Sequence, residues 1–289
     1  MADDPNKPVD LYQGDWLDLN RASWDEIVPV HVASDFYDLT ALREGRAKLF
    51  RIDDAELPLV APNGLDGLRV LHLQCHFGQD TLTLAQQGAE VVGIDFSKPA
   101  VDEARRLATE VGLENRSRFI HSNVYDARRM LPEPWSFDLV YTTWGTIGWL
   151  PDVGEWAKII SWFLKPGGRL YFADGHPAAF VFDSEGAELP YLARPYWNDG
   201  VAEVTDEQGD YAEPDVQVEN TVAWEWTHPL SEVLTALLDA GLSIDFFHEH
   251  DEIPWRMHAQ LVELGEGAYG WPAEKWLPLG YSLGATLAP

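Results

Sequence analysis

Hydrophobic positions follow two different spacings that alternate along the chain from Arg69 onward. Short apolar runs typical of buried β-strands are followed by stretches in which apolar residues recur every three to four positions, as on one face of an α-helix. This alternation is typical of βαβ units, which build a parallel sheet covered by helices. The predicted strands are 69–73, 90–94, 118–121, 137–142, 169–173, 243–248 and 281–287, and the predicted helices are 80–87, 98–111, 153–164 and 230–240. We therefore expect an α/β fold with a doubly wound, mostly parallel, seven-stranded sheet.

Two segments do not follow this alternation. The first 60 residues look mainly helical, so we expect an N-terminal helical cap at 1–60 and a main domain at 61–289. Residues 177–221 contain several prolines and glycines, and between Asp183 and Asp215 there are ten acidic residues and one basic residue. We interpret this segment as an insertion. Since it follows a strand of the parallel sheet, it is also a candidate lid over a ligand site.

The charge balance narrows the choice of partners. Asp and Glu total 48 against 20 Lys and Arg, which gives a formal net charge of −28. Such a field repels phosphate backbones and anionic membranes, so we expect neither nucleic acid nor a membrane as a partner. Cys75 is the single cysteine, and it can form neither an internal disulfide nor, alone, a thiolate zinc site. The chain has no signal-peptide pattern and no run of 18 apolar residues, so we expect a cytoplasmic protein.

The first βαβ unit contains the pattern most informative about chemistry. A strand ends at Leu73, a turn runs to Gly78, and the second strand ends at Asp95. In a doubly wound sheet, ligands bind beyond the carboxyl ends of the strands, so this turn and this acid would face one ligand. A carboxylate there can accept hydrogen bonds from ribose hydroxyls. Many βαβ proteins without a nucleotide also carry such an acid, so the pattern alone leaves nucleotide binding open.

Six segments, in order along the chain, resemble the class I S-adenosylmethionine-dependent methyltransferases. They are Val70–Gly78, Val91–Ser97, Asn123–Tyr125, Phe137–Thr143, Trp149–Asp152 and Leu164–Leu170. The first of them also resembles a bacterial subset of the family with a Leu-Gln-Cys-His-Phe-Gly variant of its glycine-rich motif. The resemblance implies a Rossmann-like methyltransferase fold with an antiparallel last strand. It also implies S-adenosyl-L-methionine as cofactor and in-line transfer of its methyl group to a small-molecule acceptor.

The family's cofactor-binding positions can be transferred residue by residue onto this sequence. The turn from Gln74 to Gly78 would hold the methionine part, Asp95 the ribose, and Asn123 the adenine amino group. The cofactor-binding residues that the resemblance implies are Gln74, Cys75, His76, Gly78, Asp95, Phe96, Ser97, Asn123, Val124, Tyr125, Thr143 and Trp144. Within this set, Phe96 and Val124 would contact the adenine faces, and Thr143 and Trp144 would lie near the methyl group.

The first motif departs from the family pattern at three positions. His72 stands where the family usually has an acid, and Gln74 and His76 stand where it has glycines. A dinucleotide needs small residues there so that the backbone can approach its pyrophosphate, whereas S-adenosylmethionine has no phosphate. The crowded turn therefore argues against an NAD-dependent oxidoreductase more than against a methyltransferase. A non-catalytic S-adenosylmethionine-binding protein is a further alternative.

His176 and His228 are the candidate general bases, because a histidine near neutral pKa can remove the proton of a methyl acceptor. His228 has a second interpretation, in which it caps the helix that starts beside Pro229. His72, Cys75 and His76 lack a fourth ligand with suitable spacing, so we expect no metal site. Aromatic residues near the predicted ligand face favour a neutral, cationic or aromatic acceptor. The sequence does not indicate an oligomeric state.

Overall fold

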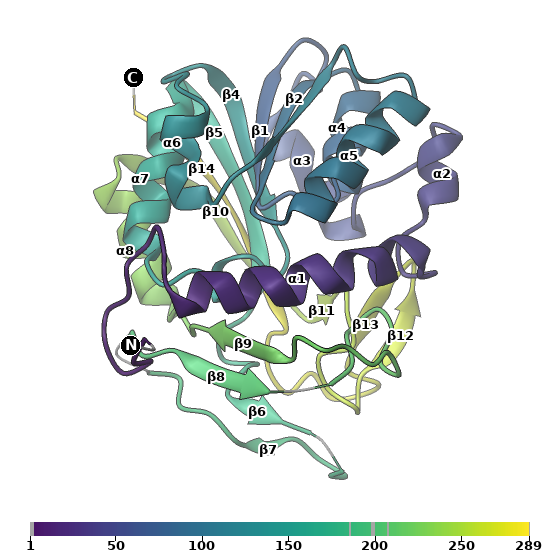
Figure 1. The fold of residues 1–289 in the computed structure, drawn as a ribbon, viewed down its shortest axis with the longest axis vertical. Coiled ribbons are helices and arrows are strands. Elements are labelled where there is room, and N and C mark those ends of the chain that lie inside the picture. The colour runs from purple at the N-terminus through teal and green to yellow at the C-terminus, as the bar shows by residue number, and fades with distance from the viewer. Residues whose placement is uncertain (1–2, 185, 198–199, 207, 289) are drawn as a thin grey trace.

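A seven-stranded sheet forms the centre of the computed structural model, which describes residues 3–184, 186–197, 200–206 and 208–288 (Figure 1). The strand order is β10-β14-β5-β4-β1-β2-β3. Their bounds are β1 Arg69–Leu73, β2 Glu90–Asp95, β3 Ser117–His121, β4 Phe137–Thr143, β5 Leu164–Gly175, β10 Leu242–His250 and β14 Gly280–Leu287. β14 pairs antiparallel with both of its neighbours, and the pairs among β1 to β5 are parallel. The predicted sheet and its antiparallel last strand are confirmed.

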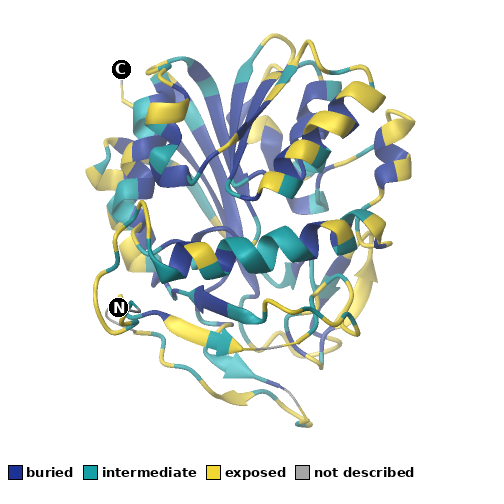
Figure 2. Ribbon diagram, viewed as in Figure 1, coloured by how far each residue is buried: buried dark blue, intermediate teal, exposed yellow. Residues whose placement is uncertain are grey.

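Helices cover both faces of the sheet (Figure 1). One face carries α3 (Arg51–Val60), α4 (Gln79–Gln86) and α5 (Lys98–Glu110), and the other carries α6 (Ala127–Met130), α7 (Val153–Phe163) and α8 (Leu230–Asp239). The inner strands β1, β2, β4, β5 and β14 are mostly buried, whereas the edge strand β10 is largely half-buried or exposed (Figure 2). α5 buries the predicted apolar stripe, and Ser97 caps it by accepting a hydrogen bond from the Ala100 amide. None of the helices in the described part of the chain combines the length and apolar character needed to cross a membrane.

The N-terminal region is helical, as predicted, but its helices lie in different places. α1 (Asp15–Ala33) runs along the end of the sheet where the parallel strands finish, and α2 (Leu39–Arg43) follows at the side (Figure 1). α3 instead packs on a sheet face, because Leu57 and Val60 are buried against Tyr141. α3 is therefore part of the layered core. The proposed cap boundary at residue 60 stays a prediction.

The segment after β5 forms two small hairpins in place of a βα unit. β6 (Phe182–Asp183) pairs with β7 (Tyr191–Leu192), and β8 (Glu203–Asp206) pairs with β9 (Val222–Glu225). Of the predicted insertion at 177–221, residues 185, 198–199 and 207 lie outside the described residues. A third small sheet, which the sequence pattern did not predict, contains β11 (Glu252–Ile253), β12 (Val262–Gly265) and β13 (Ala268–Gly270).

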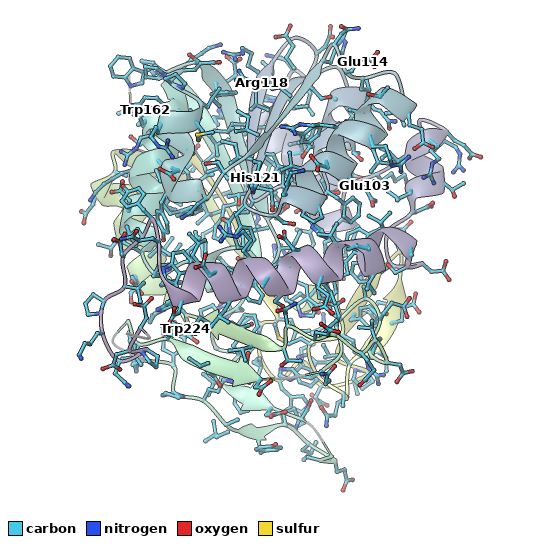
Figure 3. The ribbon with its side chains drawn as sticks, in the orientation of Figure 1. Glu103, Glu114, Arg118, His121, Trp162 and Trp224 are labelled. Carbon is cyan, nitrogen blue, oxygen red and sulfur yellow. The ribbon has the colours of Figure 1, made fainter. Side chains whose placement is uncertain are left out.

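Two reciprocal hydrogen bonds connect β9 to α1. Asn20 Nδ2 donates to the Trp224 carbonyl at 2.8 Å, and the Trp224 amide donates to Asn20 Oδ1 at 2.7 Å. Figure 3 shows Trp224 directly below the helix. Both residues are buried, so removing either partner would leave an unsatisfied polar group. This pair fixes the second hairpin against the N-terminal helix.

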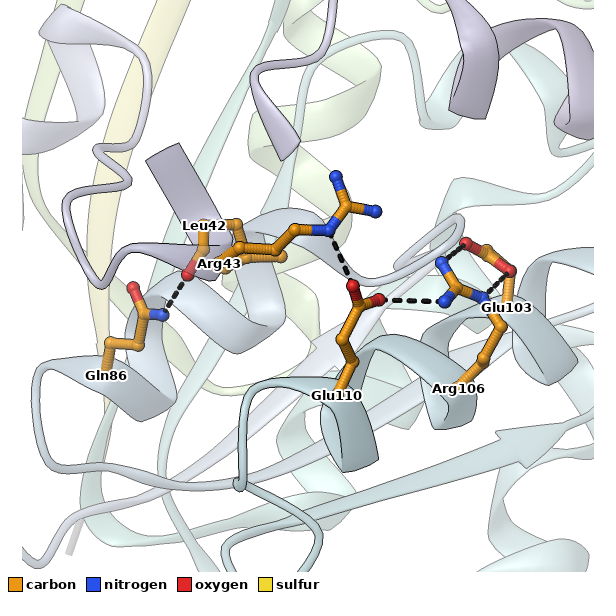
Figure 4. A network of polar contacts seen from close by, with 6 residues as sticks. All are labelled: Leu42, Arg43, Gln86, Glu103, Arg106 and Glu110. Atoms are coloured by element: carbon orange, nitrogen blue, oxygen red, sulfur yellow. Dashed lines mark hydrogen bonds and ion pairs between the residues drawn. The ribbon is translucent and has the colours of Figure 1, made fainter. Parts of the chain in front are cut away.

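Polar contacts connect α2 to α4 and α5 (Figure 4). Gln86 Nε2 donates to the Leu42 carbonyl at 2.7 Å, and Arg43 Nε lies 2.7 Å from Glu110. Arg106 binds the other oxygen of Glu110 at 2.8 Å. The charged side chains are substantially exposed, and such surface pairs contribute little to stability. They mainly orient α2.

Asp53, on α3, has a buried carboxyl group between this helix and the sheet. The sequence analysis did not single out this residue. It accepts hydrogen bonds from Trp144 Nε1 at 2.8 Å, Tyr171 Oη at 2.9 Å and Tyr141 Oη at 3.2 Å. Burial raises the pKa of Asp53 to about 8, although these donors act in the opposite direction. Asp53 therefore keeps its proton in the folded protein at pH values where the unfolded chain has lost it.

This difference predicts how stability depends on pH. Because the folded pKa lies above the unfolded one, the contribution of Asp53 is fully present below about pH 4 and is lost as pH rises towards about 8. Asp53→Asn keeps the shape and removes the ionisation. Between about pH 5 and 7, the free energy of unfolding of the original protein should fall more than that of the variant, by roughly 1 to 3 kcal/mol. Urea unfolding at both pH values measures the difference, and equal pH dependence would contradict the assignment.

Candidate active site

A cavity of about 1140 Å³ opens at the carboxyl edge of the sheet. Its walls come from the ends of β1, β2, β4 and β5, from α1 and the segment after it, from the insertion, and from the small sheet β11–β13. A pocket for one small ligand typically measures 300–1,000 Å³. The cavity is therefore large enough for a cofactor and a second small molecule, in the place where doubly wound folds bind ligands.

The turn after β1 takes left-handed backbone conformations at three positions. Gln74 has φ 55°, His76 has φ 51° and Gly78 has φ 79°. Only glycine fits at 78, because a Cβ there would lie 2.7 Å from the Phe119 ring. Gln74 Nε2 donates to the Thr146 carbonyl at 2.7 Å, which ties the turn to the loop after β4. The side chains that replace the expected glycines thus connect the turn to its surroundings.

Asp95 lies at the end of β2 and lines the cavity. Its Oδ2 accepts a hydrogen bond from the His76 amide at 2.8 Å, and its Oδ1 accepts one from the Ser97 amide at 2.9 Å. Burial raises the pKa of Asp95 to about 6, and the amide donors oppose this rise. Each carboxylate oxygen retains a lone pair after these bonds. Asp95 can therefore accept further hydrogen bonds from ligand hydroxyls.

Asp174, at the end of β5, holds the loop that follows β4. Its Oδ1 accepts hydrogen bonds from the amides of Gly145 and Gly175, both at 2.7 Å. Its Oδ2 accepts from the amides of Thr146 at 3.0 Å and Ile147 at 3.1 Å. The sequence analysis missed this residue, since only the fold shows that β5 ends beside the loop. Asp174 makes the cavity wall at β4 rigid.

Aromatic side chains form much of the wall between the turn and the insertion. Trp24 and Trp149 contact edge to face with ring centroids 5.5 Å apart, and Trp24 also contacts His76 at 5.3 Å. Tyr37, which follows α1, and Tyr211, in the insertion, form a hydrogen bond between their hydroxyl groups at 2.5 Å. Such a surface suits a flat or apolar ligand.

Most of the residues predicted to bind a cofactor lie on this wall. Those that line the cavity are Gln74, Cys75, His76, Gly78, Asp95, Phe96, Asn123, Val124, Thr143 and Trp144. Asn123 Nδ2 already donates to the Leu11 carbonyl at 2.8 Å, so this nitrogen is engaged with the N-terminal segment. Burial raises the pKa of the Cys75 thiol well above its usual range, which agrees with packing and not with a nucleophile. Their contacts with a cofactor stay predictions.

Two of the predicted residues are not on the cavity wall. Ser97 faces away because it caps α5 and its Oγ donates to Asp25 at 2.7 Å. Tyr125 is buried, with its hydroxyl 2.9 Å from the Asp152 carbonyl. Both side chains complete local structure next to the site.

The two predicted general bases are also placed unfavourably. His176 is not on the wall; its Nδ1 accepts from the Ala178 amide at 3.1 Å, and its Nε2 lies 3.2 Å from Glu249. His228 lines the cavity, but Nε2 is 2.7 Å from the Leu150 carbonyl and Nδ1 is 3.3 Å from Glu232. Both ring nitrogens of His228 are thus engaged. The alternative that His228 caps a helix is wrong, since α8 has no side-chain cap.

A chain of polar side chains that the sequence did not predict reaches the cavity at His76. His76 Nε2 lies 2.8 Å from His31 Nδ1, and His31 Nε2 lies 2.7 Å from Asp210 Oδ1. The three residues come from the turn after β1, from α1 and from the insertion, so only the folded chain brings them together. His72, by contrast, bonds Thr81 at 2.8 Å, and burial lowers its pKa to about 3. Among the described residues, no group of three His, Cys, Asp or Glu is arranged to hold a metal ion.

Comparison with known proteins agrees with this geometry. Residues 70–168 match the family described as "Methyltransferase domain". A ubiquinone biosynthesis O-methyltransferase of Stutzerimonas stutzeri is 32% identical over 126 residues, which are 43% of this chain and 52% of that protein. The chain therefore spans about half the length of this curated relative, and up to three quarters of others of the same name.

Solved structures share the fold at low sequence identity. A structure of an S-adenosylmethionine-dependent methyltransferase from Listeria monocytogenes aligns with a TM-score of 0.57 and 19% identity, covering 81% of this chain and 97% of that one. Geranyl diphosphate C-methyltransferase of Streptomyces coelicolor A3(2) aligns with a TM-score of 0.55 and 15% identity, covering 97% and 99%. Residues 70–168 are therefore a methyltransferase domain, in a chain with the fold of the class I S-adenosylmethionine-dependent methyltransferases.

Proposed function

We propose that this protein transfers a methyl group from S-adenosylmethionine to a hydroxyl group of a small aromatic acceptor. The observation that carries the proposal is one cavity that combines Asp95, at the end of β2, with an aromatic wall. Doubly wound folds bind their ligands at this edge, and an acid at the end of the second strand suits a ribose. The volume of about 1140 Å³ leaves room for an acceptor beside the cofactor.

The residues on the wall fit the cofactor. Asp95 has free lone pairs for the ribose hydroxyls, and Phe96 and Val124 present apolar surface for the adenine. Gln74 and His76 bring side chains to the cavity wall at the turn that a dinucleotide pyrophosphate would need to approach, which disfavours NAD. When bound, S-adenosylmethionine supplies an electrophilic methyl group and leaves as a neutral thioether. The protein then has to hold the acceptor oxygen at attack distance and exclude water.

Two observations support an aromatic hydroxyl compound as the acceptor. The curated relatives are named for O-methylation in ubiquinone biosynthesis, although they are only distantly similar. The cavity also has aromatic walls at Trp24, Tyr37 and Trp149. The net charge of −28 disfavours nucleic acid as the acceptor. The insertion contributes Tyr211 and Glu203 to the wall, which supports its proposed role as a cover over the acceptor.

A second candidate is a protein that binds S-adenosylmethionine without transferring its methyl group. The two non-glycine residues in left-handed conformations, Gln74 and His76, favour this alternative because their side chains lie on the cavity wall where the family pattern has glycine. Methyl transfer to any acceptor would exclude it.

The proposal predicts that the carboxylate of Asp95 contributes to cofactor affinity. Asp95→Asn should weaken S-adenosylmethionine binding at least about tenfold, since a charge-assisted hydrogen bond contributes roughly 1.5 to 3 kcal/mol. Ser97→Ala is the matched control, because Ser97 is adjacent but not on the wall. It should lower stability by about 1 kcal/mol through the lost helix cap and change affinity less than about twofold. Calorimetric titration with S-adenosylmethionine and with NAD measures the affinities of both variants. Unchanged affinity in Asp95→Asn, or binding of NAD alone, would contradict the proposal.

The proposal also predicts where the methyl group goes. With cofactor carrying a labelled methyl group and fractionated cell extract, label should enter low-molecular-weight aromatic compounds, because polyanions are repelled by the net charge of −28. Boiled protein is the control for spontaneous transfer. Label found mainly in RNA or DNA would show the acceptor class to be wrong, and binding without any transfer would favour the second candidate.

A further inference from the structure

With both imidazole rings neutral, the hydrogen-bonded chain Asp210–His31–His76 determines which nitrogens carry protons. A carboxylate can only accept, so His31 Nε2, at 2.7 Å from Asp210 Oδ1, has to donate. The other nitrogen of a neutral His31 then has no hydrogen and accepts from His76 Nε2 at 2.8 Å. His76 Nδ1 is therefore left with a lone pair. In this arrangement His76 can accept a proton only at Nδ1.

His76 is also located where a proton acceptor could act. It lines the cavity, and its backbone amide donates to Asp95 at 2.8 Å, so the residue lies on the same wall as the proposed ribose site. Trp24 and Tyr37 surround the ring at centroid distances of 5.3 and 5.8 Å. Within the described part of the chain, no side chain or backbone group is hydrogen-bonded to His76 Nδ1. That lone pair is available to a ligand.

The buried environment of His76 favours the neutral form of its imidazole ring. Burial is the largest cause that lowers the pKa of His76 well below its usual range. The ring is therefore unprotonated at neutral pH. His31 is buried and Asp210 is mostly buried, so the pair lies in an environment where a carboxylate interacts strongly with a positive charge formed nearby.

We propose that His76 is the general base for the acceptor hydroxyl, and that His31 and Asp210 are positioning residues that orient it. This inference rests on the proposed function. The hydroxyl proton moves to His76 Nδ1, the oxygen uses the freed electron pair to bond the methyl carbon, and the pair of the broken carbon–sulfur bond stays on sulfur. His76 then releases the proton to water. Asp210 belongs to the insertion, so the base is oriented only when the insertion is in place.

The first test is the tautomeric state of the unmodified protein, which needs no acceptor. In protein with ¹⁵N-labelled histidine, the NMR signals of His76 should show a protonated Nε2 and an unprotonated Nδ1, and those of His31 a protonated Nε2. His76→Asn and His31→Asn assign the signals. In Asp210→Asn, the His31 and His76 nitrogen signals should shift. A proton on His76 Nδ1 would overturn the inference.

The second test compares two phenols of different acidity, catechol and 4-nitrocatechol. A hydroxyl group of 4-nitrocatechol ionises near neutral pH, whereas those of catechol do not. His76→Asn should lower the methylation rate of catechol at least about 100-fold, the usual contribution of a general base, and that of 4-nitrocatechol less than about tenfold. Asp210→Asn should lower the rate with catechol about tenfold. His248→Asn is the matched control, since His248 bonds a carboxylate, Glu56, at 2.7 Å away from the cavity wall, and it should stay within about twofold.

The outcomes separate the two hypotheses. If the unmodified protein methylates neither phenol, the proposed function is overturned together with the inference. If it methylates both and His76→Asn is equally active, or loses both activities equally while still binding S-adenosylmethionine, only the general-base role is overturned. Selective loss with catechol supports it.

Discussion

Backbone amides at the carboxyl end of a parallel sheet have no further strand to pair with, and the site depends on how they are satisfied. Asp174 accepts from four of them and Asp95 from two, both as buried carboxylates. Acceptors of this kind hold several amides in fixed directions at once. The turn after β1 and the loop after β4 are therefore rigid before any ligand binds. The wall on the sheet side is therefore formed by the strand ends and the loops that follow them. The opposite wall is formed where α1 and the insertion pack against that edge.

The crowded first turn illustrates how a departure from a family pattern can be accommodated. Left-handed conformations at Gln74 and His76 each cost roughly 1 to 2 kcal/mol compared with glycine. Each side chain makes a contact that glycine could not make, Gln74 with the loop after β4 and His76 with α1. The strain and the contacts occur at the same two residues, which is common at functional sites.

The sequence predicted what depends on local spacing and missed what depends on distant neighbours. Apolar runs located all seven strands of the sheet, and the acid after the second strand located Asp95, because both signals lie within a few residues. The direction of a side chain at a strand end is a tertiary property. His176, expected to face the ligand, is turned towards Glu249. The partners His31 and Asp210 lie 179 residues apart, and no periodicity connects them.

The reciprocal bonds between Asn20 and Trp224 span 204 residues of sequence. During synthesis, α1 emerges from the ribosome first, yet its binding surface on β9 is made near the end. At 5 to 20 residues per second, the interval is roughly 10 to 40 s. Throughout this time Trp16 of α1 lacks its ring contact with Trp226, which follows β9. α1 can pack on α5 much earlier, through Val28, so the helix that lines the cavity is completed in two steps, and its contact with β9 is the later one.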